Sequence, residues 1–128
     1  MKEDNFCTII NTTKGKLPSL PFVSIKNAIL GSKYELGISC LSAKKQKELN
    51  NAYRGKNKTT NVLSFPLSKT TGDITFDLAK VKSEAPEFGM SYTKFLKYLF
   101  IHGLLHLKGF EHSSRMEREE QKFLKKFS

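Results

Sequence analysis

The residues best suited to chemistry are the three histidines of the chain, His102, His106 and His112. His102 and His106 are four residues apart, and four residues turn an α-helix by about 400°, so both side chains leave the same face. Their separation along the axis is about 6 Å, which lets two imidazoles bind one zinc ion at roughly 2.0–2.1 Å each. The spacing therefore predicts a metal site on a helix.

His112 can join this site only if the chain leaves the helix after His106. On a continuous helix, six residues would turn His112 roughly 240° away from His106. Gly109 lies between them, and glycine reaches the left-handed conformation that ends a helix and reverses the chain. Histidine pairs also arise by chance, but a third histidine beyond a glycine at the required break favours a metal. Three protein ligands leave a fourth position for water, which is typical of catalytic zinc sites.

Metzincin proteases share this histidine spacing, H-x-x-x-H-x-x-G-x-x-H, and use the glutamate after the first histidine as the general base. That position is Gly103 in this chain. Peptide hydrolysis by the metzincin mechanism would therefore lack its proton acceptor. We expect a zincin-like metal helix that supports a different reaction.

The charge balance indicates the kind of partner. The chain has 22 lysine and arginine residues against 12 aspartate and glutamate residues, a net charge of +10. Such an excess in a small protein favours polyanions, namely RNA, DNA, ribosomes or an anionic membrane surface. A lysine-rich surface that only keeps the protein in solution is the alternative.

Length and cysteine content favour one cytoplasmic domain covering residues 1–128. The chain has 128 residues, which is the length of one typical domain. Cys7 and Cys40 are too far apart for a metal-binding pair and too few for a disulfide framework, so we expect two reduced, buried thiols. No apolar run approaches the roughly 18 residues that span a bilayer, and the first residues lack the apolar stretch of a signal peptide.

The elements around the histidine window predict an α/β (α+β) fold. Runs of β-branched and aromatic residues predict strands at 6–10, 34–41, 61–65 and 73–76. Capping residues and apolar spacing predict helices at 20–30, 43–54, 79–85 and 92–107, and a last helix that begins with a capping box at 114–117. This order favours one small mixed sheet of about four strands packed with helices. Apolar residues cover most of the girth of helix 92–107, which predicts that the metal-binding helix is central and buried.

The histidine window resembles the signature of the YbeY family of bacterial endoribonucleases, H-G-x-L-H-L-x-G-[YF]-D-H. It departs from that signature at Glu111, where the family has aspartate. A second stretch, 54–66, is similar to the family's R-x-x-[ND]-K-P-T-N-V-L-S-F-P, with Thr59 in place of proline, and 72–74 resembles its G-D-I element. The resemblance is strong from about residue 50 to residue 112. The signature residues present here are His102, Gly103, Leu105, His106, Leu107, Gly109, Phe110 and His112.

This resemblance implies a zinc-dependent endoribonuclease that is specific for single strands. The family acts in maturation of the 3′ end of 16S ribosomal RNA and in ribosome quality control, so the implied partners are the small ribosomal subunit and its assembly factors. One zinc ion per chain would bind His102, His106 and His112. The functionally important arginine of the family maps onto Arg54, which we place with His102 at the catalytic centre.

Zinc can polarise a phosphoryl oxygen or acidify a bound water, and RNA cleavage can use either effect. Arg54 is the candidate for holding the phosphate, because a guanidinium group binds two phosphate oxygens in a fork. Lys56 and Lys58 would hold flanking phosphates, although a solvated loop is the alternative for both. Ser64 and Glu111 are candidates for the general base, and the sequence assigns neither.

Two other functions compete with this interpretation. A zinc hydrolase acting on peptides or small molecules is favoured by the metzincin-like spacing, while the missing glutamate and the +10 charge oppose it. A non-catalytic ribosome-assembly factor could bind ribosomal RNA and hold a structural metal. The sequence leaves the oligomeric state open.

Overall fold

The computed structural model describes residues 6–55 and 60–128, apart from the side chain of Arg54. Four strands form one mixed sheet in the order β1-β2-β4-β3, in which β1, β2 and β4 are parallel and β3 is antiparallel to β4. The predicted mixed sheet of four strands is confirmed. The strands are β1 Cys7–Asn11, β2 Glu35–Cys40, β3 Val62–Pro66 and β4 Thr71–Phe76.

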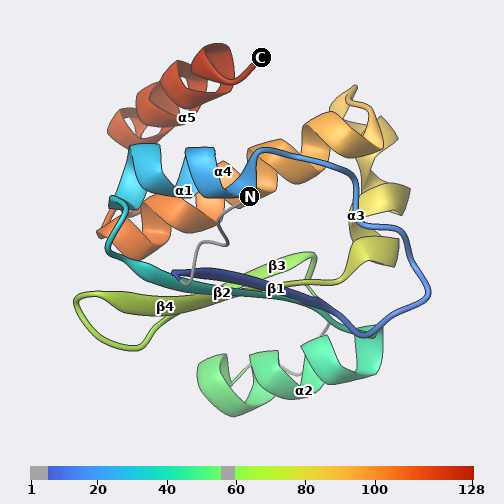
Figure 1. The fold of residues 1–128 in the computed structure, drawn as a ribbon. Coiled ribbons are helices and arrows are strands. Elements are labelled where there is room, and N and C mark those ends of the chain that lie inside the picture. The colour runs from blue at the N-terminus through green and yellow to red at the C-terminus, as the bar shows by residue number, and fades with distance from the viewer. Residues whose placement is uncertain (1–5, 56–59) are drawn as a thin grey trace.

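Helices cover both faces of the sheet (Figure 1). One face carries α4 with α1 beside it and α5 above them, and the other face carries α2 alone. A short helix, α3, lies at one end of the sheet and continues into a 3₁₀ turn, η1. The helical elements are α1 Phe22–Leu30, α2 Ala43–Arg54, α3 Leu78–Glu84, η1 Ala85–Phe88, α4 Tyr92–Lys108 and α5 Ser114–Lys126.

Helix α4 is the central element of the core, as predicted from the apolar residues on most of its sides. Ser91 caps its start by accepting a hydrogen bond from the Lys94 N–H. Eight of its residues are buried, and Phe100 packs edge-on against Phe22 of α1 with ring centroids 5.0 Å apart. Burial on this scale holds the histidine-bearing helix against the sheet. The buried residues of α4 are Phe95, Leu96, Leu99, Phe100, Ile101, Gly103, Leu104 and Leu105.

Helix α2 packs on the opposite face through amides. Gln46 and Asn50 are buried, while most of the helix faces water as its composition predicts. The Gln46 side chain donates a 3.1 Å hydrogen bond to the Thr75 carbonyl of β4. Ser42 caps the helix and Gly55 ends it in the left-handed conformation, so both predicted boundaries are confirmed.

Lysine 26 anchors the corner between α1 and β2. Its side chain is fully buried, and its ammonium donates hydrogen bonds of 2.9–3.2 Å to three carbonyls, those of Gly31, Ser32 and Tyr34. A buried ammonium is stable only when its protons are satisfied in this way. The cation also lies where the carbonyls of α1 point, at the negative end of the helix dipole.

Several predicted boundaries were displaced. The first helix begins at Phe22 rather than residue 20, with Pro21 at its cap. The last helix is capped by Ser113, whose side chain accepts from the Met116 N–H, so the capping box expected from Ser114 was wrong by one residue. Strand β3 includes Pro66, which an edge strand tolerates because its missing N–H need not pair.

Two remaining expectations concern cysteines and membranes. Cys40 is buried and Cys7 is partly buried, and both are free thiols. Burial raises the pKa of the Cys40 thiol to about 11, which keeps it protonated and unreactive. Within residues 6–55 and 60–128, every helix is too short or too polar to cross a lipid bilayer.

Candidate metal centre

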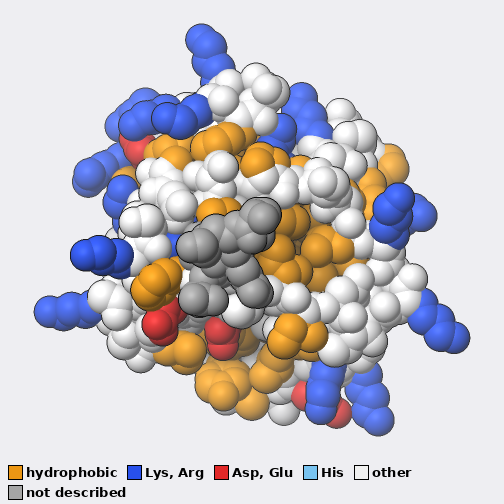
Figure 2. Space-filling view, in the orientation of Figure 1, with side chains coloured by type: hydrophobic (Ala, Val, Ile, Leu, Met, Phe, Trp, Pro, Cys, Tyr) orange, Lys and Arg blue, Asp and Glu red, His pale blue; other side chains and the backbone are white. Residues whose placement is uncertain are grey.

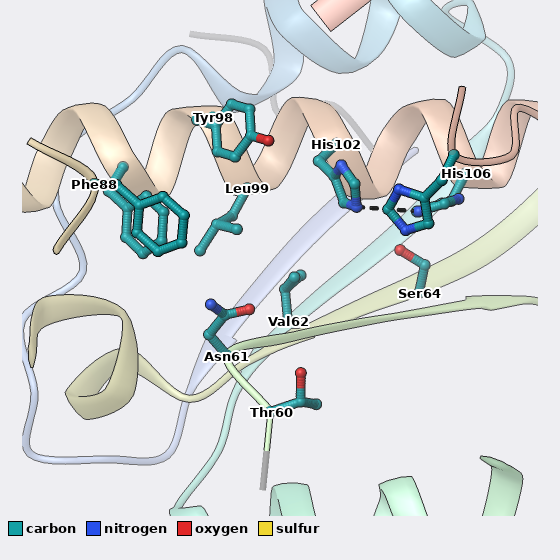
Figure 3. A pocket seen from close by; sticks show the side chains of 11 residues that line it. Thr60, Asn61, Val62, Ser64, Phe88, Tyr98, Leu99, His102 and His106 are labelled. Atoms are coloured by element: carbon teal, nitrogen blue, oxygen red, sulfur yellow. Dashed lines mark hydrogen bonds between the residues drawn. The ribbon is translucent and has the colours of Figure 1, made fainter. Parts of the chain in front are cut away.

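The last turns of α4 present two imidazoles on one face. The ring centroids of His102 and His106 lie 4.5 Å apart, and their Nε2 atoms are 3.1 Å apart (Figure 3). The rings meet almost at right angles, with an interplanar angle of 88°. The i, i+4 spacing thus places both Nε2 lone pairs toward one point.

A glycine break brings in the third histidine. Gly109 ends α4 with φ +113°, and its N–H bonds the carbonyls of His106 and Leu105. The chain then turns back, which places the His112 ring 5.0 Å from His102 and 4.9 Å from His106, centroid to centroid. One ligand atom from each of the three histidines lies within 4.8 Å of the other two. The predicted departure of the chain from the helix at Gly109 is confirmed.

Hydrogen bonds behind the rings set the tautomers of two histidines. The Nδ1–H of His106 donates to the Phe110 carbonyl at 3.0 Å, and the Nδ1–H of His102 donates to the Glu120 carboxylate at 2.5 Å. Both protons are therefore on the outer nitrogens, and both Nε2 atoms carry lone pairs. Two lone pairs 3.1 Å apart repel unless a cation lies between them, so this donor set fits a metal ion that prefers nitrogen ligands.

Glu120 is the functional residue that the sequence interpretation missed. Its carboxylate is 4% exposed and reaches His102 from α5, eighteen residues further along the chain. A carboxylate behind a ligating histidine fixes the ring and raises its basicity. One signal was available: Glu120 lies four residues after Met116 and three before Phe123, on the buried stripe of an otherwise polar helix.

Burial favours the metal-binding form of the site. Burial lowers the pKa of His106 below its ordinary value, and the nearby His102 lowers it further, because an imidazolium is poorly solvated there and repels its neighbour. A neutral imidazole is the form that binds a metal. Burial also raises the pKa of Tyr98, followed by the negative charges of Glu120 and Glu117, so its phenol stays protonated.

The histidines lie at one end of an open cavity of about 530 Å³ (Figure 3). Helix α4 forms one wall with apolar and aromatic side chains, and the beginning of β3 forms the other wall. The remaining lining residues are Thr60, Asn61, Val62, Ser64, Phe88, Phe95, Tyr98 and Leu99. The cavity is large enough to admit part of an extended polymer beside the metal ligands.

Gly103 has a packing reason to be glycine. A Cβ atom there would lie 2.9 Å from Ser64 Oγ and 3.1 Å from Ile74 Cδ1, so α4 approaches the sheet too closely for a side chain. The Ser64 hydroxyl donates a 3.1 Å hydrogen bond to the Gly103 carbonyl across this contact. The glutamate of a metzincin has no room at this position.

The other predicted site residues are distributed unevenly. Ser64 lines the cavity, whereas Glu111 is exposed and is not part of the cavity wall. Arg54 is the last residue of α2, and its side chain lies outside the described part of the structure. Lys56 and Lys58 also lie outside the described residues.

Known proteins resemble this chain in sequence and fold. The family model for Endoribonuclease YbeY matches residues 19–128. The protein named Endoribonuclease YbeY from Alkaliphilus metalliredigens is 34% identical over 100 residues, covering 70% of this chain and 64% of that protein. The protein of the same name from Nautilia profundicola is 40% identical over 89 residues, covering 64% of each. The matches therefore span slightly less than two thirds of these relatives.

A solved structure shares the architecture. The solution structure of TM1509 from Thermotoga maritima matches with a TM-score of 0.63 and 27% sequence identity. The match covers 92% of this chain and 86% of that one. The two proteins therefore share the fold over most of this chain.

Proposed function

Because this chain belongs to the YbeY family, we propose that it is a zinc-dependent endoribonuclease that cuts single-stranded RNA. The observation that supports this proposal most directly is the convergence of three imidazoles at one end of an open cavity. The relatives that match this chain at 34% and 40% identity are named Endoribonuclease YbeY. The net charge of +10 suits a polyanionic substrate.

The proposed substrate within the cell is 16S ribosomal RNA near its 3′ end, with a further role in ribosome quality control. The family resemblance supports this assignment, and it makes the small ribosomal subunit and its assembly factors the partners. On the face shown in Figure 2, Lys and Arg side chains project around the outline rather than gathering in one patch. Such a distribution attracts RNA without reading its sequence. Work on ribosomal RNA would place the protein in the cytoplasm.

The residues proposed to hold the zinc ion are His102, His106 and His112. A bound zinc ion supplies Lewis-acid stabilisation of negative charge on a phosphoryl oxygen. The protein's own part is orientation: Glu120 and the Phe110 carbonyl hold the outer ring protons, which keeps the Nε2 atoms free for the metal. Neither ring has to change tautomer when the metal binds.

The substrate phosphate needs a cation beyond the metal. We assign this role to Arg54, because the planar guanidinium group can bind two phosphate oxygens and share the charge that develops on them. Lys56 and Lys58 would contact neighbouring phosphates. Ser64 lines the cavity but its hydroxyl donates to the Gly103 carbonyl, and Glu111 lies outside the cavity wall, so neither residue is assigned as the general base.

A cleavage assay tests the proposed activity. Purified protein should carry about one zinc ion and cut single-stranded RNA, and a chelator should abolish cutting until zinc is restored. Changing His112 to alanine should remove both zinc and activity, whereas Ser114→Ala, two residues away and exposed, serves as the matched control. Cleavage that persists in metal-free protein would contradict the proposal. Arg54→Ala should lose RNA cleavage and keep zinc.

The alternatives make different predictions. A peptide hydrolase would cleave casein rather than RNA, and the lack of space beside Gly103 argues against the metzincin form of that reaction. A non-catalytic assembly factor would function without a catalytic metal. A His106→Ala variant that restores growth in cells lacking the protein would support that third function.

A further inference from the structure

A row of aromatic rings connects the molecular surface to the metal centre. We call Phe88, Phe95 and Tyr98 the aromatic row. Phe88 stacks on Phe95 with centroids 4.8 Å apart and an interplanar angle of 21°, and Phe95 lies nearly parallel to Tyr98 at 6.3 Å. Tyr98 is in turn 6.1 Å from His102. Figure 3 shows Phe88 and the histidines at opposite ends of one cavity.

The ring of Phe88 is held in place although 57% of the residue is exposed. It is the last residue of η1, a turn that contains Pro86 and is closed by Gly89 at φ +66°. Phe95 beneath it is 1% exposed and fixed in the core. A single exposed apolar side chain is ordinary on a protein surface. Here the side chain is stacked on one side, exposed to solvent and part of the cavity wall.

We propose that Phe88 is a stacking platform for a nucleobase of the single-stranded RNA bound at the metal centre. This inference rests on the proposed function. Unpaired bases stack on aromatic side chains in most proteins that recognise single strands, and such stacking tolerates any base because every base has a flat face. A duplex hides these faces, so a platform at this point would contribute to a preference for single strands.

Charge near the platform favours a base over a phosphate. Glu87 is exposed next to Phe88, and Glu84 is one turn earlier, where it accepts a 2.8 Å hydrogen bond from Asn61. Lys80 neutralises Glu84 through a 3.0 Å ion pair, but Glu87 would repel a phosphate placed over the ring. The RNA backbone would therefore run on the far side of the base.

The position of the platform along α4 indicates where the stacked base lies relative to the cleaved bond. Phe95, which carries the stacked Phe88 ring, is seven residues before His102, or about 10 Å along the helix axis. The platform, which is stacked on Phe95, is therefore set apart along α4 from the point where the three histidines converge. The stacked base would thus belong to a nucleotide near the cleaved bond, and it would not be the group attacked.

Kinetics of single variants test the platform. Phe88→Leu keeps an apolar contact on Phe95 but loses the aromatic face, and it should raise the KM for single-stranded RNA by roughly 5- to 150-fold with kcat and zinc content unchanged. Phe88→Trp should restore the KM. Phe6→Leu is the matched control, because Phe6 is also exposed but lines a different surface hollow. An unchanged KM in Phe88→Leu, with the wild type active, would overturn the inference and leave the proposed function standing.

Binding of the base can be observed directly because the chain has no tryptophan. In zinc-loaded Phe88→Trp protein, a short single-stranded RNA should quench the fluorescence, and removing the base at one position of the RNA should abolish most of that quenching. Phe6→Trp should not respond. Quenching by casein and not by RNA would identify a peptide side chain as the occupant and overturn the inference. A wild-type protein that neither cuts nor binds RNA would refute the proposed function itself.

Discussion

Helices α4 and α2 cover opposite faces of the same sheet, yet they bury different kinds of side chain (Figure 1). Helix α4 buries eight residues, seven with aliphatic or aromatic side chains plus Gly103, and it approaches the sheet closely at that glycine. Helix α2 buries the amides of Gln46 and Asn50. The free energy gained by burying apolar side chains grows with the area buried. A buried hydrogen bond adds little net stability, because it replaces a hydrogen bond to water.

This difference separates the two tasks of the proposed enzyme. The three histidines are carried by the tightly packed face and the turn that follows it. Arg54, the proposed phosphate-binding residue, ends the helix on the other face. Mutations on the two faces should therefore differ in their effects on stability and on zinc binding, and four changes test this expectation.

The largest effect is expected in the core of α4. Phe100 is fully buried and contacts Phe22 and Phe76, so Phe100→Ala should lower the free energy of unfolding by about 3–5 kcal/mol. Urea denaturation would measure the change. Tyr53→Ala on α2 is the matched aromatic control; it is 70% exposed and should lose less than about 1 kcal/mol. Equal losses would show that the two helices are anchored alike.

The next effect concerns the support of the metal ligands. Glu120→Gln keeps an oxygen that can accept the His102 proton but removes the negative charge, so zinc affinity should fall by about 10- to 100-fold. Competition with a chelator would give the affinity. Glu117→Gln, on the exposed side of α5, should bind zinc like the wild type. If both variants bind equally well, the carboxylate has no part in the site.

A smaller loss is expected where α2 meets the sheet. Gln46→Ala removes the donor to the Thr75 carbonyl and should destabilise the protein by about 1–2 kcal/mol. Zinc content should not change, because the histidines lie on the other face. Thermal unfolding with metal analysis on the same sample would check both statements, and a loss of zinc would mean that the faces are coupled.

The smallest effect should come from Asp73 on β4. Burial raises the pKa of this carboxyl, so its charged form is disfavoured in the folded protein. The stability contributed by the neutral acid is present below the unfolded pKa and is lost as pH rises through the folded pKa. Asp73→Asn should therefore be slightly more stable than wild type at pH 7, by less than about 1 kcal/mol, and the gain should vanish in acid. Denaturation at both pH values would show it.

Most of the metal centre could be predicted from residues that are close together in the sequence. The spacing of His102 and His106 is a property of one helix, and Gly109 marks the turn that returns His112, so neighbours in sequence were sufficient. Glu120 could not be assigned in the same way. Its contact with His102 depends on how α5 packs on α4, which no short stretch of sequence specifies.

The same distinction between local and long-range contacts holds for the helix caps and the strands. Ser42 and Ser91 were recognised because a cap is made within one turn. The amide packing of α2 was not, because Gln46 is polar and its partner is in a strand 29 residues away. Likewise β4 begins at Thr71, two residues earlier than expected, since its pairing with Glu35 of β2 extends the strand.

The buried ammonium of Lys26 has a practical consequence. Its three carbonyl partners shield the amine from solvent, so an acylating reagent can reach it only when the corner between α1 and β2 opens. The rate at which that one lysine is acylated therefore follows opening of the fold, while exposed lysines such as Lys45 react at once. Peptide mass mapping after timed acylation would turn this side chain into an internal gauge of native-state opening.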